Sequence, residues 1–141
     1  MIRIPRGVLE EIRAQGAQAY PEECCGALVG QATGGGVKTV HLTRRFENRH
    51  PPGARDRRYF VGPDAYRDAE SWAKNQGLDV VGIYHSHPDH PAQPSEYDRE
   101  HAWPWYSYLI LSVEGGTAAD LTSWVLASER DRFDPEELEC P

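Results

Sequence analysis

The sequence is poor in cysteine and has no long apolar run, and each shortage argues against a class of protein. Three of its 141 residues are cysteine, and Cys24 and Cys25 are adjacent, which argues against a disulfide framework. The spacing Cys-x-x-Cys does not occur, which disfavours a zinc site built on paired cysteines. No stretch approaches the roughly 20 apolar residues of a membrane span, and the N-terminus lacks the apolar core of a signal peptide. We therefore expect a cytoplasmic protein that is not attached to a membrane.

Basic residues are also in the minority. Fifteen Lys and Arg stand against 22 Asp and Glu, a formal net charge of −7. Binding to nucleic acid relies on neutralising phosphates, so we expect no nucleic-acid partner. The exception is an Arg-rich segment over residues 44–58, which is either a solvated surface loop or a basic lip for an acidic partner or a C-terminal carboxylate. Its arginines are Arg44, Arg45, Arg49, Arg55, Arg57 and Arg58.

The pattern of apolar residues predicts one α/β domain over residues 1–130. Helical spacing predicts helices near residues 5–19 and 64–75, and short β-branched or aromatic runs predict the strands. Those strands are 24–29, 37–42, 79–84, 105–113 and 119–126. The first two and the last two of these strands form predicted hairpins, and helices connect the strand 79–84 to both. We therefore expect a mixed sheet with helices packed on it. Residues 131–141 are expected to form a polar tail or a short helix.

One stretch carries two histidines in a metal-binding pattern. Residues 79–84 predict a buried strand, and His85 and His87 come at or just beyond its C-terminal end. Residues two apart in extended backbone point to the same side, so both imidazoles can face one point. After a proline-rich loop, Ser95 can cap a helix whose first turn brings Asp98 towards the histidines. Two imidazoles and one carboxylate leave a fourth tetrahedral position for water, as a catalytic zinc site requires.

Each part of this stretch also has an ordinary structural explanation. Ser95 and Asp98 have the spacing of a capping box, and histidines near a strand end can be polar rim residues. Ser86 is expected to face away from the histidines, with a packing or a supporting role. The joint pattern of His-x-His, seven residues and Ser-x-x-Asp favours the metal site. A zinc nucleobase deaminase would need His-x-Glu and Pro-Cys-x-x-Cys, and neither occurs.

This joint pattern resembles the signature of the JAMM (MPN-plus, Mov34/PAD-type) zinc metalloproteases, in their compact prokaryotic branch. Upstream, residues 22–26 are similar to the family's Glu-x-Cys-Gly segment, with Glu23 in the catalytic position. The resemblance implies an α/β/α arrangement around a curved mixed β-sheet, as in cytidine deaminases. It also implies Zn²⁺ held by His85, His87 and Asp98, with Glu23 and Ser95 as catalytic residues.

The resemblance further implies a substrate. Family members cleave peptide or isopeptide bonds after the C-terminal Gly-Gly of ubiquitin-like proteins, and for this compact chain a ubiquitin-fold sulfur-carrier protein is the expected partner. Glu23 would pass a proton from water to the leaving amine, and Ser95 would either donate to the oxyanion or cap its helix. A deubiquitinase-like isopeptidase and a hydrolase of another amide are alternatives. A non-catalytic MPN-type scaffold is disfavoured, because such relatives lose the metal ligands.

Overall fold

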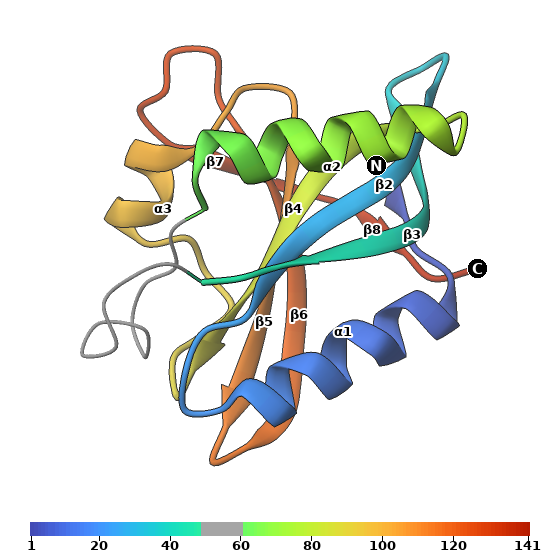
Figure 1. Cartoon of the computed structure of the whole chain (residues 1–141). Coiled ribbons are helices and arrows are strands. Elements are labelled where there is room, and N and C mark those ends of the chain that lie inside the picture. The colour runs from blue at the N-terminus through green and yellow to red at the C-terminus, as the bar shows by residue number, and fades with distance from the viewer. Residues whose placement is uncertain (49–60) are drawn as a thin grey trace.

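The computed structural model describes residues 1–48 and 61–141, which form one mixed sheet of eight strands with three helices (Figure 1). The strands are β1 (Ile2–Arg3), β2 (Cys25–Thr33), β3 (Val37–Phe46), β4 (Asp79–Pro88), β5 (Ser107–Glu114), β6 (Thr117–Leu126), β7 (Phe133–Glu136) and β8 (Leu138–Glu139). The helices are α1 (Arg6–Ala19), α2 (Pro63–Asn75) and α3 (Glu96–His101).

The sheet curves until its two edges almost meet. Its strand order is β7-β6-β5-β4-β2-β3-β1-β8, with β4 parallel to β5 and antiparallel to β2. The edge strands β7 and β8 are separated in the chain only by Glu137, whose carbonyl oxygen accepts a hydrogen bond from the N–H of Ile2 at 2.9 Å. A flat sheet of this width could not place consecutive strands at opposite edges. The prediction of a curved mixed sheet is therefore confirmed.

The expectation of a short helix in the C-terminal residues is wrong. Phe133–Glu136 pairs antiparallel with β6, and Leu138–Glu139 pairs parallel with β1. The N–H of Ile4 donates to the carbonyl oxygen of Glu139 at 2.9 Å. Pairing with two existing strand edges satisfies backbone groups that a short polar helix would leave to water, so tertiary context decides the conformation.

The two faces of the sheet are covered by different helices, which confirms the α/β/α arrangement (Figure 1). Side chains alternate along each strand, so Leu28 joins the core under α1, whereas Ala27 and Val29 join the core under α2. From the helices, Ile12 enters the first core and Ala73 the second. On β4, Tyr84 faces α1 and Ile83 faces α2. His85 and His87 follow Ile83 at every second position of the same strand. Both therefore lie on the α2 side of the sheet.

Strand β4 is longer than the sequence predicts. It runs to Pro88, so His85 and His87 lie within the strand and not beyond its end. The extra residues pair with β5, His85 opposite Ile110 and His87 opposite Ser112. On the other side β2 begins only at Cys25, opposite His85. The end of β4 thus projects past β2, which opens space beside the two imidazoles.

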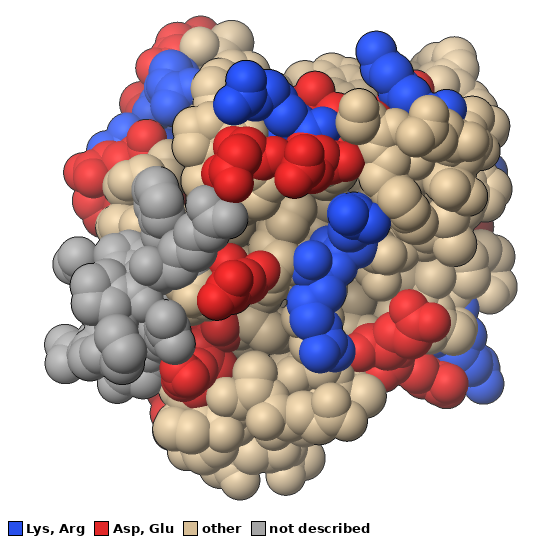
Figure 2. Space-filling model, in the orientation of Figure 1, with Lys and Arg blue, Asp and Glu red and all other residues tan. Residues whose placement is uncertain are grey.

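The Arg-rich segment begins in a strand rather than in a loop. Arg44 and Arg45 belong to β3, and the Arg44 guanidinium lies over the Trp72 ring, 5.1 Å from its centroid. The face in Figure 2 shows basic and acidic side chains next to one another. The other arginines of the segment, Arg49, Arg55, Arg57 and Arg58, lie outside the described residues, as does the hypothesis of a basic lip that depends on them. Among the residues described, no helix has the length and apolarity needed to cross a membrane.

We expect Gly26→Ala to destabilise the protein by about 1–3 kcal/mol, because overpacking a filled core costs this much. A Cβ at Gly26 would lie 2.3 Å from the ring carbon Cζ of Tyr84, and that ring is held by its hydroxyl, which donates to Gln15 at 2.5 Å. Urea unfolding measures the loss. Gly7→Ala is the matched control, because its Cβ meets nothing within 4 Å and alanine favours the helix. Equal stability of the two variants would contradict the packing explanation.

Candidate metal centre

Three side chains meet at the projecting end of β4. Nε2 of His85 lies 3.1 Å from Nε2 of His87 and 3.3 Å from Oδ2 of Asp98, and Nε2 of His87 lies 3.2 Å from the same oxygen. All three residues are buried. Tetrahedral zinc with bonds of about 2.0–2.1 Å separates its ligand atoms by about 3.3 Å. The triangle therefore has the size of one face of a zinc coordination sphere.

The hydrogen bond from His87 to Pro91 leaves Nε2 as the ring nitrogen that can bind a metal. Nδ1 of His87 lies 2.9 Å from the carbonyl oxygen of Pro91, which can only accept, so Nδ1 carries the proton. In the tautomer that coordinates a metal, the unprotonated Nε2 would present its lone pair towards Oδ2 of Asp98. A ring nitrogen and a carboxylate oxygen 3.2 Å apart need a cation between them, which is either a proton or a metal ion. The donor set fits a metal ion.

Asp98 is positioned by the start of α3. Its backbone N–H donates to Oγ of Ser95 at 3.0 Å, and its own Oδ2 accepts from the Ser95 N–H at 2.9 Å, which completes a capping box. The box fixes the carboxylate on the first turn of the helix and aims it at the histidines. The motif Ser-x-x-Asp is thus a helix cap and a ligand-positioning device at once, so the two interpretations of its spacing are compatible.

Burial and charge favour the protonation states that bind metals. Burial lowers the pKa of the His85 imidazole, and the charge of Asp98 only partly offsets this effect. Burial raises the pKa of Asp98, but His85, His87 and the hydrogen bond from the Ser95 N–H lower it more, so the net pKa lies well below the usual range. A neutral imidazole and an ionised carboxylate are the forms that coordinate a metal.

Glu23 reaches the same place from a distant segment. It precedes β2, it is 4% exposed, and its carboxylate oxygen lies within 4.8 Å of a ring nitrogen of each histidine. Two hydrogen bonds to β4 hold the Glu23 segment in this position. The Cys24 N–H donates to Oγ of Ser86 at 2.9 Å, and the Ser86 N–H donates to the Cys24 carbonyl oxygen at 3.0 Å. Ser86 faces away from the metal triangle, as expected, and its role is to hold the chain beside Glu23.

All five predicted site residues are brought together around one pocket. Glu23, His87 and Ser95 line a pocket of about 320 Å³, together with residues of the loop between β4 and α3. Asp98 and His85 contact His87 directly, at 3.2 Å and 3.1 Å. Ligand atoms of Glu23, His85 and His87 all lie within 4.8 Å of one another, which is close enough to hold one metal ion. The two histidines therefore have two carboxylates near them, those of Glu23 and Asp98.

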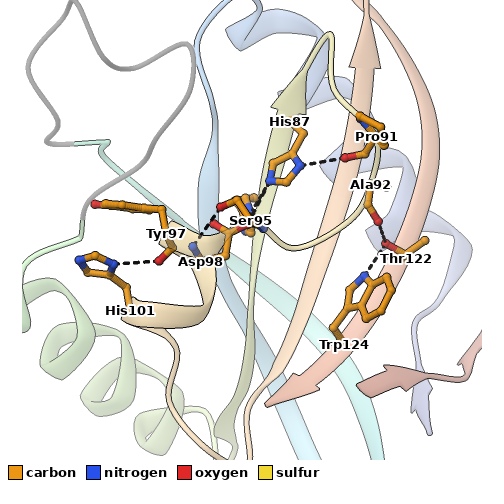
Figure 3. A network of polar contacts seen from close by, with 10 residues as sticks. His87, Pro91, Ala92, Ser95, Tyr97, Asp98, His101, Thr122 and Trp124 are labelled. Carbon is orange, nitrogen blue, oxygen red and sulfur yellow. Dashed lines mark hydrogen bonds and ion pairs between the residues drawn. The ribbon is translucent and has the colours of Figure 1, made fainter. Parts of the chain in front are cut away.

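The loop between β4 and α3 is anchored by residues that the sequence motif does not contain. Oγ of Ser112 donates to the carbonyl oxygen of His90 at 2.7 Å, and Oγ1 of Thr122 donates to that of Ala92 at 2.6 Å. Figure 3 shows the second contact beside the bond from His87 to Pro91. These donors come from β5 and β6. Nothing in the local sequence marks them, because their partners are about 20–30 residues away.

Comparison with known proteins places the chain in a family. The model of the Prok-JAB family, described as prokaryotic homologues of the JAB domain, matches residues 5–127. A desampylase from Haloferax volcanii is 34% identical over 113 residues, which cover 79% of this chain and 78% of the relative. A probable TtuB-protein conjugate cleaving protease from Thermus thermophilus is 32% identical over 115 residues, covering 82% and 72%. The solution structure of a Salinibacter ruber protein is 46% identical, with a TM-score of 0.77, and covers 99% of this chain and 91% of that one.

The matched region contains both motif segments, the Glu23 segment before β2 and the stretch from His85 to Asp98. It also includes α1, α2 and the strands from β2 to β6. The resemblance inferred from the spacing of the motif is thereby confirmed. The chain belongs to the Prok-JAB family, the prokaryotic homologues of the JAB domain.

Proposed function

We propose that this chain is a zinc metallopeptidase that acts in the cytoplasm. Its reaction is hydrolysis of the peptide or isopeptide bond after the C-terminal Gly-Gly of a ubiquitin-like sulfur-carrier protein. The observation that carries the proposal is the triangle of His85, His87 and Asp98, whose ligand atoms lie 3.1–3.3 Å apart with Glu23 beside them. The names of the two relatives, a desampylase and a conjugate cleaving protease, support a protein conjugate as substrate.

Nε2 of His85, Nε2 of His87 and Oδ2 of Asp98 are the atoms that would hold the zinc. Two nitrogens and one carboxylate oxygen form a ligand set that catalytic zinc sites use, and it leaves one position open. When bound, zinc supplies the Lewis acidity that lowers the pKa of a water molecule and polarises the scissile carbonyl. The hydrogen bond from His87 Nδ1 to the Pro91 carbonyl oxygen orients that ring and makes Nε2 a more basic metal ligand.

Glu23 is the general base and then the general acid. Its carboxylate takes a proton from the attacking water, whose oxygen bonds to the carbonyl carbon. As the C–N bond breaks, the same carboxyl group gives its proton to the leaving nitrogen. The products are an amine and a carboxylic acid, and the acid loses the second proton of the water to solvent at neutral pH. Glu23 faces the pocket that it shares with His87 and Ser95, where both partners of this transfer would lie.

The Ser95 hydroxyl donates a hydrogen bond to the carbonyl oxygen as negative charge develops on it. Its capping role does not prevent this. Oγ accepts from the Asp98 N–H with a lone pair, and a hydroxyl still has its O–H to donate. Ser95 is exposed and lines the pocket, so its O–H can turn towards a substrate.

We expect Ser95→Gly to lower kcat by roughly 10- to 1000-fold, because one oxyanion donor is lost. Glycine costs a helix cap only a few tenths of a kcal/mol, so the zinc content and the thermal midpoint should change little. Ser95→Thr, which keeps both the cap and the O–H, is the matched control and should stay close to wild type. If Ser95→Gly cleaved as fast as wild type, Ser95 would be a cap alone.

The proposal is tested with a carrier of ubiquitin fold that ends in Gly-Gly. One form carries a single extra residue in peptide linkage, and a second is joined through an isopeptide bond to a lysine side chain. Mass spectrometry after incubation with the zinc-loaded chain identifies the bond cut. Cleavage after Gly-Gly in either form supports the proposal and identifies the linkage preferred. Cleavage of small unrelated amides, with neither carrier form cut, would favour the broader amide hydrolase.

A further inference from the structure

The segment that carries Glu23 is tied to the end of β4 at a second point, besides the hydrogen bonds between Cys24 and Ser86. The Tyr20 hydroxyl donates to Oδ2 of Asp89 at 2.5 Å. Tyr20 comes directly after α1, and Asp89 comes directly after β4. Glu23 lies between the two ties, so its backbone is held from both ends.

Asp89 is itself held in place by its backbone and its side chain. Its N–H donates to the carbonyl oxygen of Val113 at 2.6 Å, and its Oδ1 accepts from the Gly115 N–H at 2.8 Å. Its φ is 57°, in the left-handed region that aspartate tolerates better than most residues. Both partners belong to the end of β5 and the turn that follows it. The oxygen that Tyr20 contacts is therefore fixed relative to the β5–β6 hairpin.

The Tyr20 ring is seated against the sheet. It is half-buried and packs against the apolar core under α1. A Cβ at Gly116 would lie 3.7 Å from its Cδ1, so the ring borders the turn between β5 and β6. Figure 1 shows the end of α1, this turn and the end of β4 together at one end of the sheet. The hydrogen bond to Asp89 raises the pKa of the Tyr20 phenol, which therefore remains a donor at physiological pH.

Glu23 needs this support because it lies between α1 and β2, outside any helix or strand. Its carboxylate has to stay within hydrogen-bond reach of the attacking water and then of the leaving nitrogen. A misplacement of about 1 Å at an active site can cost about 100-fold in rate. Ser86 and Asp89 flank His87 in the chain, so both ties connect the base to the part of β4 that carries the histidines.

We propose that Tyr20 is a positioning residue for the reaction, which through Asp89 holds Glu23 within reach of the attacking water. The inference rests on the function proposed above and adds to it a residue that neither touches the substrate nor binds the metal. Because the Tyr20–Asp89 pair acts on the placement of the base, its loss lowers kcat and leaves KM and the zinc content near their wild-type values.

Tyr20→Phe removes the hydroxyl and keeps the ring. We expect kcat for Gly-Gly cleavage to fall roughly tenfold, a partial loss of what a positioned general base contributes, with KM and zinc content within about twofold of wild type. Thr43→Val is the matched control. It also removes a hydroxyl that donates to a carboxylate, that of Glu11 at 3.3 Å, but this contact holds the middle of α1 and not the segment after it. The control should cleave at the wild-type rate.

A second comparison shows whether Tyr20 acts through Glu23. In the Glu23→Gln background, where the base is already lost, Tyr20→Phe should change kcat by less than about twofold, because both substitutions remove the same contribution. An undiminished tenfold loss in that background would mean that Tyr20 acts on another part of the site, and would overturn the proposal. A Tyr20→Phe chain with the wild-type kcat would overturn it as well.

Amide hydrogen exchange of the zinc-loaded chain tests the same tie without any substrate. The Cys24 N–H, which donates to Oγ of Ser86, reports how firmly the Glu23 segment is held. Its exchange should be roughly tenfold faster in Tyr20→Phe, the effect of losing one hydrogen bond to a charged group. Unchanged exchange would overturn the proposal. If the wild-type chain cut no carrier, the proposed function would fail, and the exchange rates would still decide whether Tyr20 holds the segment.

Discussion

Glu23→Gln is expected to lower the rate of Gly-Gly cleavage by about 10²- to 10⁴-fold, the usual contribution of a positioned general base. Glutamine has nearly the same shape, but its amide cannot accept and return the proton. Because His85, His87 and Asp98 suffice to hold zinc in the proposed site, the variant should keep its metal. Single-turnover cleavage and elemental analysis of the same preparation measure both quantities.

Glu22→Gln is the matched control, since it removes the charge of the adjacent residue. Glu22 does not belong to the described wall of the pocket shared by Glu23, His87 and Ser95, so this variant should cleave at the wild-type rate. Loss of both metal and cleavage in Glu23→Gln would identify Glu23 as a metal ligand instead. That outcome has a structural basis, because Glu23 and the two histidines lie close enough to bind one ion.

Asp98→Asn should remove zinc and cleavage together. The amide still offers an oxygen to the Ser95 N–H, so the cap of α3 is largely kept, but the anionic ligand 3.2–3.3 Å from both Nε2 atoms is lost. Loss of a hydrogen bond around a metal site costs about 10- to 100-fold in affinity, and loss of a charged ligand should cost more. Competition with a chromogenic chelator measures the zinc affinity.

The fold of this variant is checked by comparison with the metal-free wild-type chain. Both should unfold at similar temperatures, because the capping hydrogen bonds and the cores on both sides of the sheet are the same. A variant that unfolds far earlier would point to a role of Asp98 in folding. Wild-type zinc affinity in a folded Asp98→Asn chain would show that Asp98 is not a ligand.

Much of the fold and the site could be predicted from the sequence because both depend on local patterns. Alternation placed His85 and His87 on one side of a strand, and the cap signal placed Asp98 on the first turn of a helix. The structure has both arrangements. The helices α1 and α2 were predicted to within one residue at each end, since each has an apolar face, a proline near its start and a clear stop.

What could not be predicted depends on partners far away in the chain. The length of β4 is set by β5, and the strand conformation of 133–139 is set by β6 and β1. The strand expected over 105–113 begins only at Ser107, so Trp105 lies with Trp103 in the segment between α3 and β5, and both are more than half exposed. Composition alone does not distinguish a buried tryptophan from one that lines a pocket.

The most direct test of the metallopeptidase is zinc content measured together with cleavage on one preparation of the wild-type chain. Elemental analysis after zinc loading and desalting gives the stoichiometry, and a carrier extended beyond its Gly-Gly gives the rate. We expect close to one zinc per chain, and cleavage that a chelator stops and added zinc restores. A fully folded chain that binds no zinc under these conditions would contradict the metal centre and the catalytic function proposed for it.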